Sequence, residues 1–317
     1  MVIYMDNFIY SINATLPIFL LIILGKVLFK IHILDEHFTR VVDKYVFMIA
    51  LPVLVFKDLT ENDIRESFDA RYILFCFFVT LFCILAIWGL TELLMKNESE
   101  KGAFIQASYR SSAAILGLAF IDNMYHGAGM APLMIIGAVP LYNIFAVIIL
   151  TIKGDNGGQQ PNIRATLVNV LKNPILLGIL FALPFAFLGI HFPAVINKAM
   201  TSIGNTATPL ALLSIGATFE GRKAIKKIKP TVLATFIKLI LLPALFLPLA
   251  VFFHYRNQEL MAILIMLGSP STVSCYIMAK VTGNDHDLTS SIIVLTTLLS
   301  SITLTTWIFI LRSMGVL

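Results

Sequence analysis

The sequence predicts an all-α membrane protein with ten transmembrane helices in two inverted five-helix repeats, in which helices four and nine are broken and cross. The first observation behind this prediction is composition, because 58% of the 317 residues are hydrophobic and only 13% are charged. Soluble domains carry about 25% charged residues. The second is that apolar runs of about 20 residues, long enough to cross the hydrocarbon core of a bilayer, recur along the whole chain. The third is a spacing that the two halves share.

Five apolar runs occupy each half of the chain. In the first half the predicted helices cover residues 7–28, 38–57, 70–95, 102–122 and 130–152. In the second half they cover residues 171–190, 194–219, 230–253, 260–281 and 288–311. A polar stretch containing Gly157, Gly158 and Pro161 separates the two sets, and this composition is typical of a linker. We therefore expect a first repeat at residues 1–152, a cytoplasmic linker at 153–162 and a second repeat at 163–317.

Helix-weakening features in the two halves have a common spacing. Pro17 and Pro174 are 157 residues apart, as are Pro52 and Pro209. The same shift places residues 111–113 on residues 268–270. Three features that share one spacing without gaps indicate a duplication, as in many transporters. Because each copy has an odd number of helices, the two copies are expected to have opposite orientations in the membrane.

The distribution of basic residues predicts the orientation of the chain. With the N-terminus outside, fifteen of the 23 Lys and Arg residues lie in cytoplasmic loops and six lie on the opposite side. Cytoplasmic loops carry such an excess, so both termini are expected to face outward. We expect a multi-pass protein of the plasma membrane, the inner membrane in a bacterium.

The fourth predicted helix carries Arg110, followed by Ser111 and Ser112. An arginine at this depth costs at least about 2.5 kcal/mol on insertion scales, so it must face a cavity, a partner or a ligand. One interpretation is that the guanidinium reaches the interface or bonds to a carbonyl of a broken helix. The interpretation that we favour is a positive charge facing an anion near the middle of the membrane.

The ninth predicted helix carries Ser269, Pro270, Ser271 and Thr272. Proline removes a backbone hydrogen bond and displaces the carbonyl one turn earlier, so the helix is expected to break here. A simple kink is the alternative. A break at membrane depth requires a cavity or surrounding protein, and the N-termini of half-helices attract anions. The shared spacing favours a crossing of the two broken helices near the bilayer centre.

Other polar residues within predicted helices are open to two interpretations. Asn205, Thr206 and Thr208 either line the same cavity or bond neighbouring helices. Lys238 is expected to reach the interface or face other helices, with a coupling role as the alternative. The membrane centre then carries positive charge without an evident acid, which favours an anionic substrate and identifies no residue for a coupling ion.

Metal, cofactor and enzyme chemistry find little support. Cys76, Cys83 and Cys275 lie within predicted helices, and the six histidines lie in predicted loops without metal-binding spacing. We therefore expect no metal, no cofactor and no enzymatic activity. The net charge of +5 is spread over short loops, which argues against a nucleic-acid partner.

Several short motifs carry a resemblance to a known family. They are Leu51-Pro52, Arg110-Ser111-Ser112 with Ile115-Leu116-Gly117-Leu118, residues 173–178, residues 208–216, Ser269-Pro270-Ser271, and residues 296–300. In this order, over the whole chain, they resemble the auxin efflux carrier family, which includes bacterial malate permease-like proteins and plant auxin exporters.

The resemblance implies a substrate site where helices four and nine cross. It also implies a transport part made of helices three to five and eight to ten, and a scaffold, with a dimer contact, made of the other four. The family often has Asn where this chain has Ser112, and often Pro where it has Ala119. The linker lacks the long hydrophilic loop of many plant exporters, so auxin itself is not implied.

The expected function is secondary active transport of small organic acid anions, such as malate-like carboxylates, by alternating access. Arg110 would pair with the carboxylate, and the full set of expected substrate-binding residues is Arg110, Ser111, Ser112, Asn205, Ser269, Pro270, Ser271 and Thr272. The lipid bilayer, a coupling proton or sodium ion and a homodimer are the other expected partners. The alternatives are a sodium-coupled symporter of the bile-acid type, a membrane-embedded enzyme, and a sensor without transport.

Overall fold

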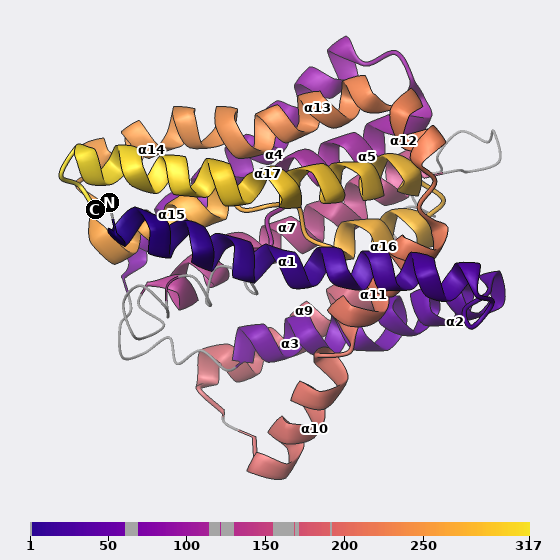
Figure 1. Cartoon of the computed structure of the whole chain (residues 1–317). Helices are drawn as coiled ribbons and strands as arrows, with labels where there is room; N and C mark the ends of the chain where they lie inside the picture. The colour runs from indigo at the N-terminus through magenta and orange to yellow at the C-terminus, as the bar shows by residue number, and fades with distance from the viewer. Residues whose placement is uncertain are drawn as a thin grey trace.

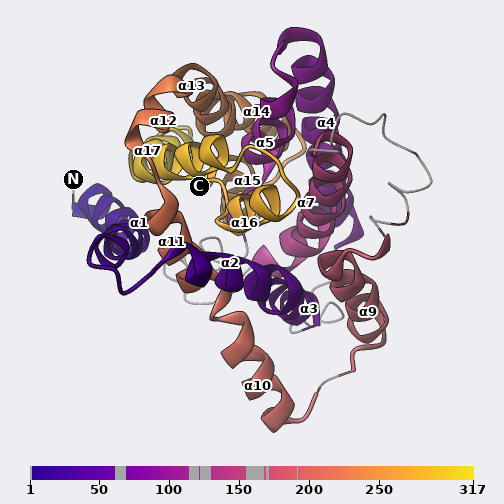
Figure 2. The same cartoon turned by 90° about the vertical axis from the view of Figure 1, so that its right-hand side faces the viewer.

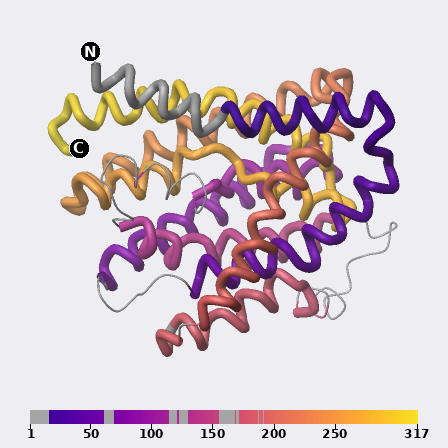
Figure 3. The backbone as a smooth tube through the Cα atoms, turned by 60° about the horizontal axis from the view of Figure 1, so that its bottom comes forward, coloured from indigo at the N-terminus to yellow at the C-terminus, as the bar shows by residue number. Residues whose placement is uncertain are grey.

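The computed structural model describes residues 2–60, 69–113, 130–154, 171–190 and 192–317, together with residues 121 and 168. Over these residues the chain is helical apart from its connections and one isolated bridge between Ser111 and Ser271. The long helices lie side by side, and the chain folds back repeatedly along one direction (Figures 1 and 3). The start of α1 and the end of α17 lie at the same end of the molecule (Figure 1). The all-α prediction is confirmed.

The helices occur in the order in which the apolar runs appear. In the first half they are α1 (Val2–Lys30), α2 (Glu36–Tyr45), the π-helical turn η1 (Val46–Ala50), α3 (Leu51–Thr60), α4 (Ala70–Leu94), α5 (Glu98–Tyr109) and α7 (Ala131–Lys153). In the second half they are α9 (Pro174–Leu188), α10 (Ala194–Gly204), α11 (Ala207–Thr218), α12 (Gly221–Lys226), α13 (Ile228–Phe236), the π-helical turn η3 (Ile237–Leu241), α14 (Leu242–Phe252), α15 (Asn257–Gly268), α16 (Ser274–Val281) and α17 (His286–Ser313).

Side-chain caps fix the starts of several helices. At the start of α4, the carboxylate of Asp69 accepts a hydrogen bond from the N–H of Tyr72 at 3.1 Å. At the start of α17, the carboxylate of Asp285 accepts one from the N–H of Leu288 at 2.9 Å. Asn173 caps α9 in the same way. These side chains satisfy N–H groups that have no partner within the helix.

Four helical segments of the described chain are long and apolar enough to cross a membrane. They are α4, α7, α17 and the continuous segment from α13 to α14. Their bounds agree with the predicted helices to within a few residues. The seventh predicted helix differs, because it is divided into α10 and α11 at Asn205 and Thr206. Pro209 has no N–H to donate to the carbonyl of Asn205, one turn earlier, which accounts for the interruption.

The fourth and ninth predicted helices are interrupted in the structure. The first part of helix four, α5, ends at Tyr109, and its continuation lies largely outside the described residues. In helix nine, α15 ends at Gly268 and α16 begins at Ser274, with Pro270 between them. Proline removes a helix hydrogen bond there, so the broken ninth helix follows from its sequence.

Buried apolar residues form two large clusters. One lies among α4, α5, α7, α14, α15 and α17. The other lies among α2, η1, α3, α9, α11 and α16, with contributions from α1, α7 and α17. Along the helix axes, α2 and α3 lie on one side, and α4, α5, α14 and α17 lie on the other (Figure 2). The helices are therefore packed around two centres.

Glycines bring α1 and α11 into close contact. A Cβ on Gly216 would lie 2.0 Å from the carbonyl oxygen of Ile22, and one on Gly25 would lie 2.3 Å from that of Leu213. Small residues at such positions let helix backbones approach in membranes, where hydrophobic exclusion from water does not drive association. The α1–α11 pair consequently depends on these two glycines.

Candidate functional site

The two broken helices are joined where they cross. The N–H of Ser112 donates to the carbonyl of Pro270 at 2.9 Å. The hydroxyl of Ser271 donates to the carbonyl of Ala107 at 2.5 Å, and that of Ser111 donates to the carbonyl of Met266. The hydroxyls of Ser271 and Ser111 thus each satisfy a carbonyl in the last turn of the opposite half-helix, where helices leave carbonyls without partners.

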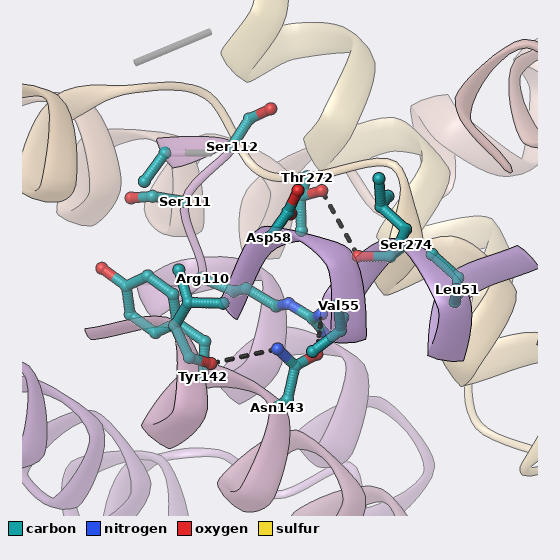
Figure 4. A pocket seen from close by; sticks show the side chains of 13 residues that line it. Leu51, Val55, Asp58, Arg110, Ser111, Ser112, Tyr142, Asn143, Thr272 and Ser274 are labelled. Carbon is teal, nitrogen blue, oxygen red and sulfur yellow. Dashed lines mark hydrogen bonds between the residues drawn. The ribbon is translucent and has the colours of Figure 1, made fainter. Parts of the chain in front are cut away.

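A small cavity lies beside this crossing, between α3, α7 and the non-helical residues. Its volume is about 50 Å³, enough for a few water molecules. Its walls are formed by Leu51, Leu54, Val55, Asp58, Arg110, Ser111, Ser112, Ala113, Val139, Tyr142, Asn143, Thr272 and Ser274. Figure 4 shows the Arg110 side chain extending into this group toward Asn143.

Arg110 is the C-cap of α5 and is only 5% exposed. Its Nη2 donates to Oδ1 of Asn143 at 2.5 Å, and its Nη1 lies 2.7 Å from the sulfur of Met278. When the Gln106 amide is oriented to satisfy its neighbours, its oxygen lies 3.2 Å from Nη1 and its nitrogen 3.3 Å from the carbonyl of Cys275. Every one of these partners is uncharged.

The guanidinium retains unused capacity toward a ligand. Arginine has five N–H donors in a planar fork, whereas the described residues supply two amide oxygens and a weakly accepting sulfur. A carboxylate can accept two parallel hydrogen bonds from such a fork. A positive charge at this depth is costly unless it has a partner, so this arrangement favours an anion in the cavity.

A second positive electrostatic contribution comes from the start of α16. Thr272 and Ser274 line the cavity, and their hydroxyl oxygens lie 3.3 Å apart. The N-cap residue, Val273, makes no side-chain hydrogen bond to the helix. A helix N-terminus carries about half a positive charge, so α16 and Arg110 both favour an anion in the same space.

Several wall residues did not emerge from the sequence. Asn143 and Tyr142 come from α7. Asn143 is the partner of Arg110, and the hydroxyl of Tyr142 donates to the carbonyl of Met266 at 3.0 Å. Asp58, from α3, contributes an acid to the wall. An asparagine within an apolar run was a signal for Asn143, whereas Asp58 lies at the end of its run.

The expected site residues are distributed in three ways. Arg110, Ser111, Ser112 and Thr272 line the cavity. Ser269, Pro270 and Ser271 lie buried at the crossing, and Ser269 has no hydrogen-bond partner for its hydroxyl among the described residues. Asn205 is exposed between α10 and α11 and is not among the residues lining the cavity.

Comparison with known proteins identifies the family. Residues 10–308 match the model of a family described as membrane transport protein. The chain belongs to this family. The resemblance to auxin efflux carriers is thereby confirmed at family level, and the apolar helices agree with a multi-pass membrane protein.

Similar proteins from other organisms support the same class. An uncharacterized transporter of Methanocaldococcus jannaschii is 23% identical over 310 residues, covering 94% of this chain and 98% of that protein. The uncharacterized transporter YfdV of Escherichia coli is 22% identical over 278 residues, covering 86% and 88%. A Rhizobium meliloti protein named "Putative malonate transporter" is 24% identical over 317 residues, covering 95% and 96%. This family member is accordingly similar to transporters along nearly its whole length.

Proposed function

We propose that this protein is a secondary active transporter of small organic acid anions, and that it works by alternating access. The observation that carries the proposal is the buried guanidinium of Arg110, which lines the cavity beside the start of α16 and whose hydrogen-bond partners among the described residues are all uncharged. Carboxylates match the fork of an arginine. A dicarboxylate is favoured within this class, and the name of the Rhizobium meliloti relative points the same way.

The helix boundaries support a ten-helix, inverted-repeat architecture. The ends of α1, α3 and α4 at Lys30, Thr60 and Leu94 precede the ends of α9, α11 and α14 by 158 residues each. The ends of α5 and α7 precede those of α15 and α17 by 159 and 160 residues. Five pairs with nearly constant spacing support a repeat at residues 1–152 and a second at 163–317. With five helices in each, the repeats would be inverted.

The two packing centres support a division into a scaffold and a transport part. Leu51, Val55 and Asp58 of α3 form one wall of the cavity, while Arg110 and Thr272 at the crossing form another. A shift between the two parts would therefore change access to the guanidinium. Because the cavity has room only for a few water molecules, loading a carboxylate would require these walls to separate.

An ion pair connects the proposed parts. Nζ of Lys280, in α16, lies 2.6 Å from Oδ2 of Asp43, in α2, and the Ser214 hydroxyl of α11 donates to the same carboxylate at 2.6 Å. This contact would hold one conformation until substrate binding favours another. Both termini would face outward from a bacterial inner membrane, with the scaffold helices forming the contact of a homodimer.

The test is uptake of radiolabelled malonate and malate into proteoliposomes by wild type and Arg110→Gln. Wild type should show saturable uptake driven by a gradient, and the variant should lose it by about a hundredfold, the loss expected when a charged hydrogen-bond pair is removed. Arg222→Gln is the matched control, because Arg222 lies exposed in α12. Normal uptake by Arg110→Gln would contradict the assignment of Arg110. Absence of uptake for every carboxylate would contradict the substrate class.

A further inference from the structure

Lys238 is a second buried cation, outside the cavity. It lies in η3, between α13 and α14, and is 0% exposed. Isolated ammonium groups are very costly to bury. A lysine buried in this way is either neutral or held by groups that compensate its charge.

Four oxygens surround the ammonium, and all are uncharged. Nζ lies 2.7 Å from the carbonyl oxygen of Leu267, 3.2 Å from that of Tyr109 and 3.5 Å from that of Met266, and it also donates to the hydroxyl oxygen of Ser111. An ammonium has three N–H donors, so its capacity is filled. Carbonyl and hydroxyl oxygens converging on one point are also ligands that hard metal cations use.

The carbonyls belong to the ends of two helices. Tyr109 is the last residue of α5, and Leu267 precedes the last residue of α15. A helix C-terminus carries about half a negative charge. Two such ends directed at one point approach a full negative charge, which a single monovalent cation balances. In transporters, unwound carbonyls and half-helix C-termini coordinate coupling ions such as sodium.

The local backbone holds Lys238 at this point. Residues of η3 form a π-helical turn, in which the backbone does not follow the α-helical hydrogen-bond pattern. The indole N–H of Trp307, in α17, donates to the carbonyl of Leu239 at 3.0 Å and so satisfies a polar group of this turn. The ammonium is consequently fixed by the fold around η3.

We propose that the Lys238 ammonium is a built-in cation, occupying the place at the crossed helices where a coupling sodium ion would otherwise bind. Anion transport then needs no sodium, and a short side chain at position 238 opens a site for a small monovalent cation. The transport part of this inference rests on the function proposed above. The cation site itself does not, because it concerns the stability of the crossing.

Ser111 connects the built-in cation to the anion site. Its hydroxyl oxygen accepts from Lys238, and it lies in the cavity wall next to Arg110. Loss of the ammonium should displace residues 109–111 and thereby weaken transport as well as stability. The effect on transport is expected to be indirect, because Lys238 does not line the cavity.

The experiment measures the melting temperature of purified protein in choline, sodium, lithium and methylammonium chloride at equal ionic strength. The proteins are wild type, Lys238→Ala, Lys238→Met, and Lys226→Ala as a control at an exposed position. Wild type and the control should melt at the same temperature in all four salts. Lys238→Ala should melt lower in choline and recover saturably with a small cation, whereas Lys238→Met, whose side chain fills the space, should melt lower without recovery.

Uptake completes the test. Wild-type uptake should be equal in sodium and choline. In choline, the uptake rate of Lys238→Ala should fall by about tenfold or more, which is the cost of losing charged hydrogen bonds. The variant should regain uptake with the cation that restores its melting temperature. Stabilisation or stimulation of wild type by sodium would overturn the proposal, and this arm requires no variant to fold. A folded Lys238→Ala that responds to no cation would also overturn it. Failure of carboxylate uptake alone leaves the melting result standing, so the two proposals fail separately.

Discussion

Arg110 and Lys238 are two cations buried at the same crossing, yet their surroundings differ. Lys238 is 0% exposed, and four oxygens at the ends of α5 and α15 surround it. Arg110 borders a cavity and contacts amide oxygens and a sulfur. One charge is compensated by the negative ends of helices, while the other lies near the positive end of α16.

Under the function proposed above, this difference would separate a structural charge, Lys238, from a ligand-binding charge, Arg110. Lys238 has three donors and enough acceptors, so a ligand would have to displace carbonyls from it. Arg110 has five donors and few acceptors among the described residues, so a ligand would complete its hydrogen bonding. Depth in the membrane alone does not distinguish them, whereas the count and chemistry of the partners does.

Lys238→Met should separate the two cations most strongly. It leaves the carbonyls of Tyr109 and Leu267 without a donor, and each unsatisfied buried group costs about 1–3 kcal/mol. We expect the free energy of unfolding in detergent to fall by about 3 kcal/mol, against less than about 1 kcal/mol for Arg110→Gln, because Arg110 itself borders the cavity. Equal losses in chemical denaturation would remove the distinction.

Asn143→Asp should give the guanidinium of Arg110 a permanent anionic partner. A carboxylate in place of the amide at 2.5 Å from Nη2 would occupy the guanidinium and compete with the substrate. We expect KM for carboxylate uptake to rise about a hundredfold, as for other charged hydrogen bonds, together with a higher melting temperature. Asn143→Ala is the control and should raise KM less. An unchanged KM in the aspartate variant would argue that substrate does not contact Arg110.

Arg110→Lys tests whether the fork matters beyond the charge. Lysine retains the positive charge but loses the planar pair of donors, so KM should rise by about tenfold, the equivalent of one lost hydrogen bond. Arg222→Lys provides the matched exposed substitution. A variant with wild-type KM would show that Arg110 acts as a point charge, and the comparison of donor capacity would then be wrong.

Ser111→Ala should affect both cations weakly. Its hydroxyl contacts Lys238 and Met266, so stability should fall by about 1 kcal/mol and uptake by about threefold, as the cavity wall shifts. Ser112→Ala should change less, because Ser112 holds the crossing through its backbone N–H. Thermal denaturation and initial uptake rates measure both effects, and a larger loss for Ser112→Ala would reverse the expected order.

The sequence alone predicted the structural features that depend on local chemistry. The continuous apolar runs located α4, α7 and α17, and Pro270 located the interruption between α15 and α16. Arg110 and Thr272 were expected at the site and line the cavity. The helix predictions succeed because a bilayer sets helix length and proline disrupts helical hydrogen bonding wherever it lies, whereas the substrate-binding role of Arg110 and Thr272 stays a prediction.

The remaining features depend on contacts between distant residues. From the sequence, Lys238 was expected at an interface or facing other helices. Its carbonyl partners could not be predicted, because they come from helix ends that are 129 and 29 residues away in sequence. Asn143 gains its role from an arginine on another helix. Asn205 was included for its polarity, yet the turn between α10 and α11 exposes it. No local pattern contains such pairings.

In the proposed transport cycle, the reciprocal serine hydrogen bonds at the crossing would constrain the route of the solute. Separating α5 from α15 would leave the carbonyls of Ala107 and Met266, which accept from Ser271 and Ser111, facing a hydrocarbon medium that cannot hydrogen-bond them. The crossed pair should therefore travel as a rigid body, carrying Arg110 with it. In that cycle, the transported anion would pass along the face of the crossed helices that is turned toward α3 and would not pass between them.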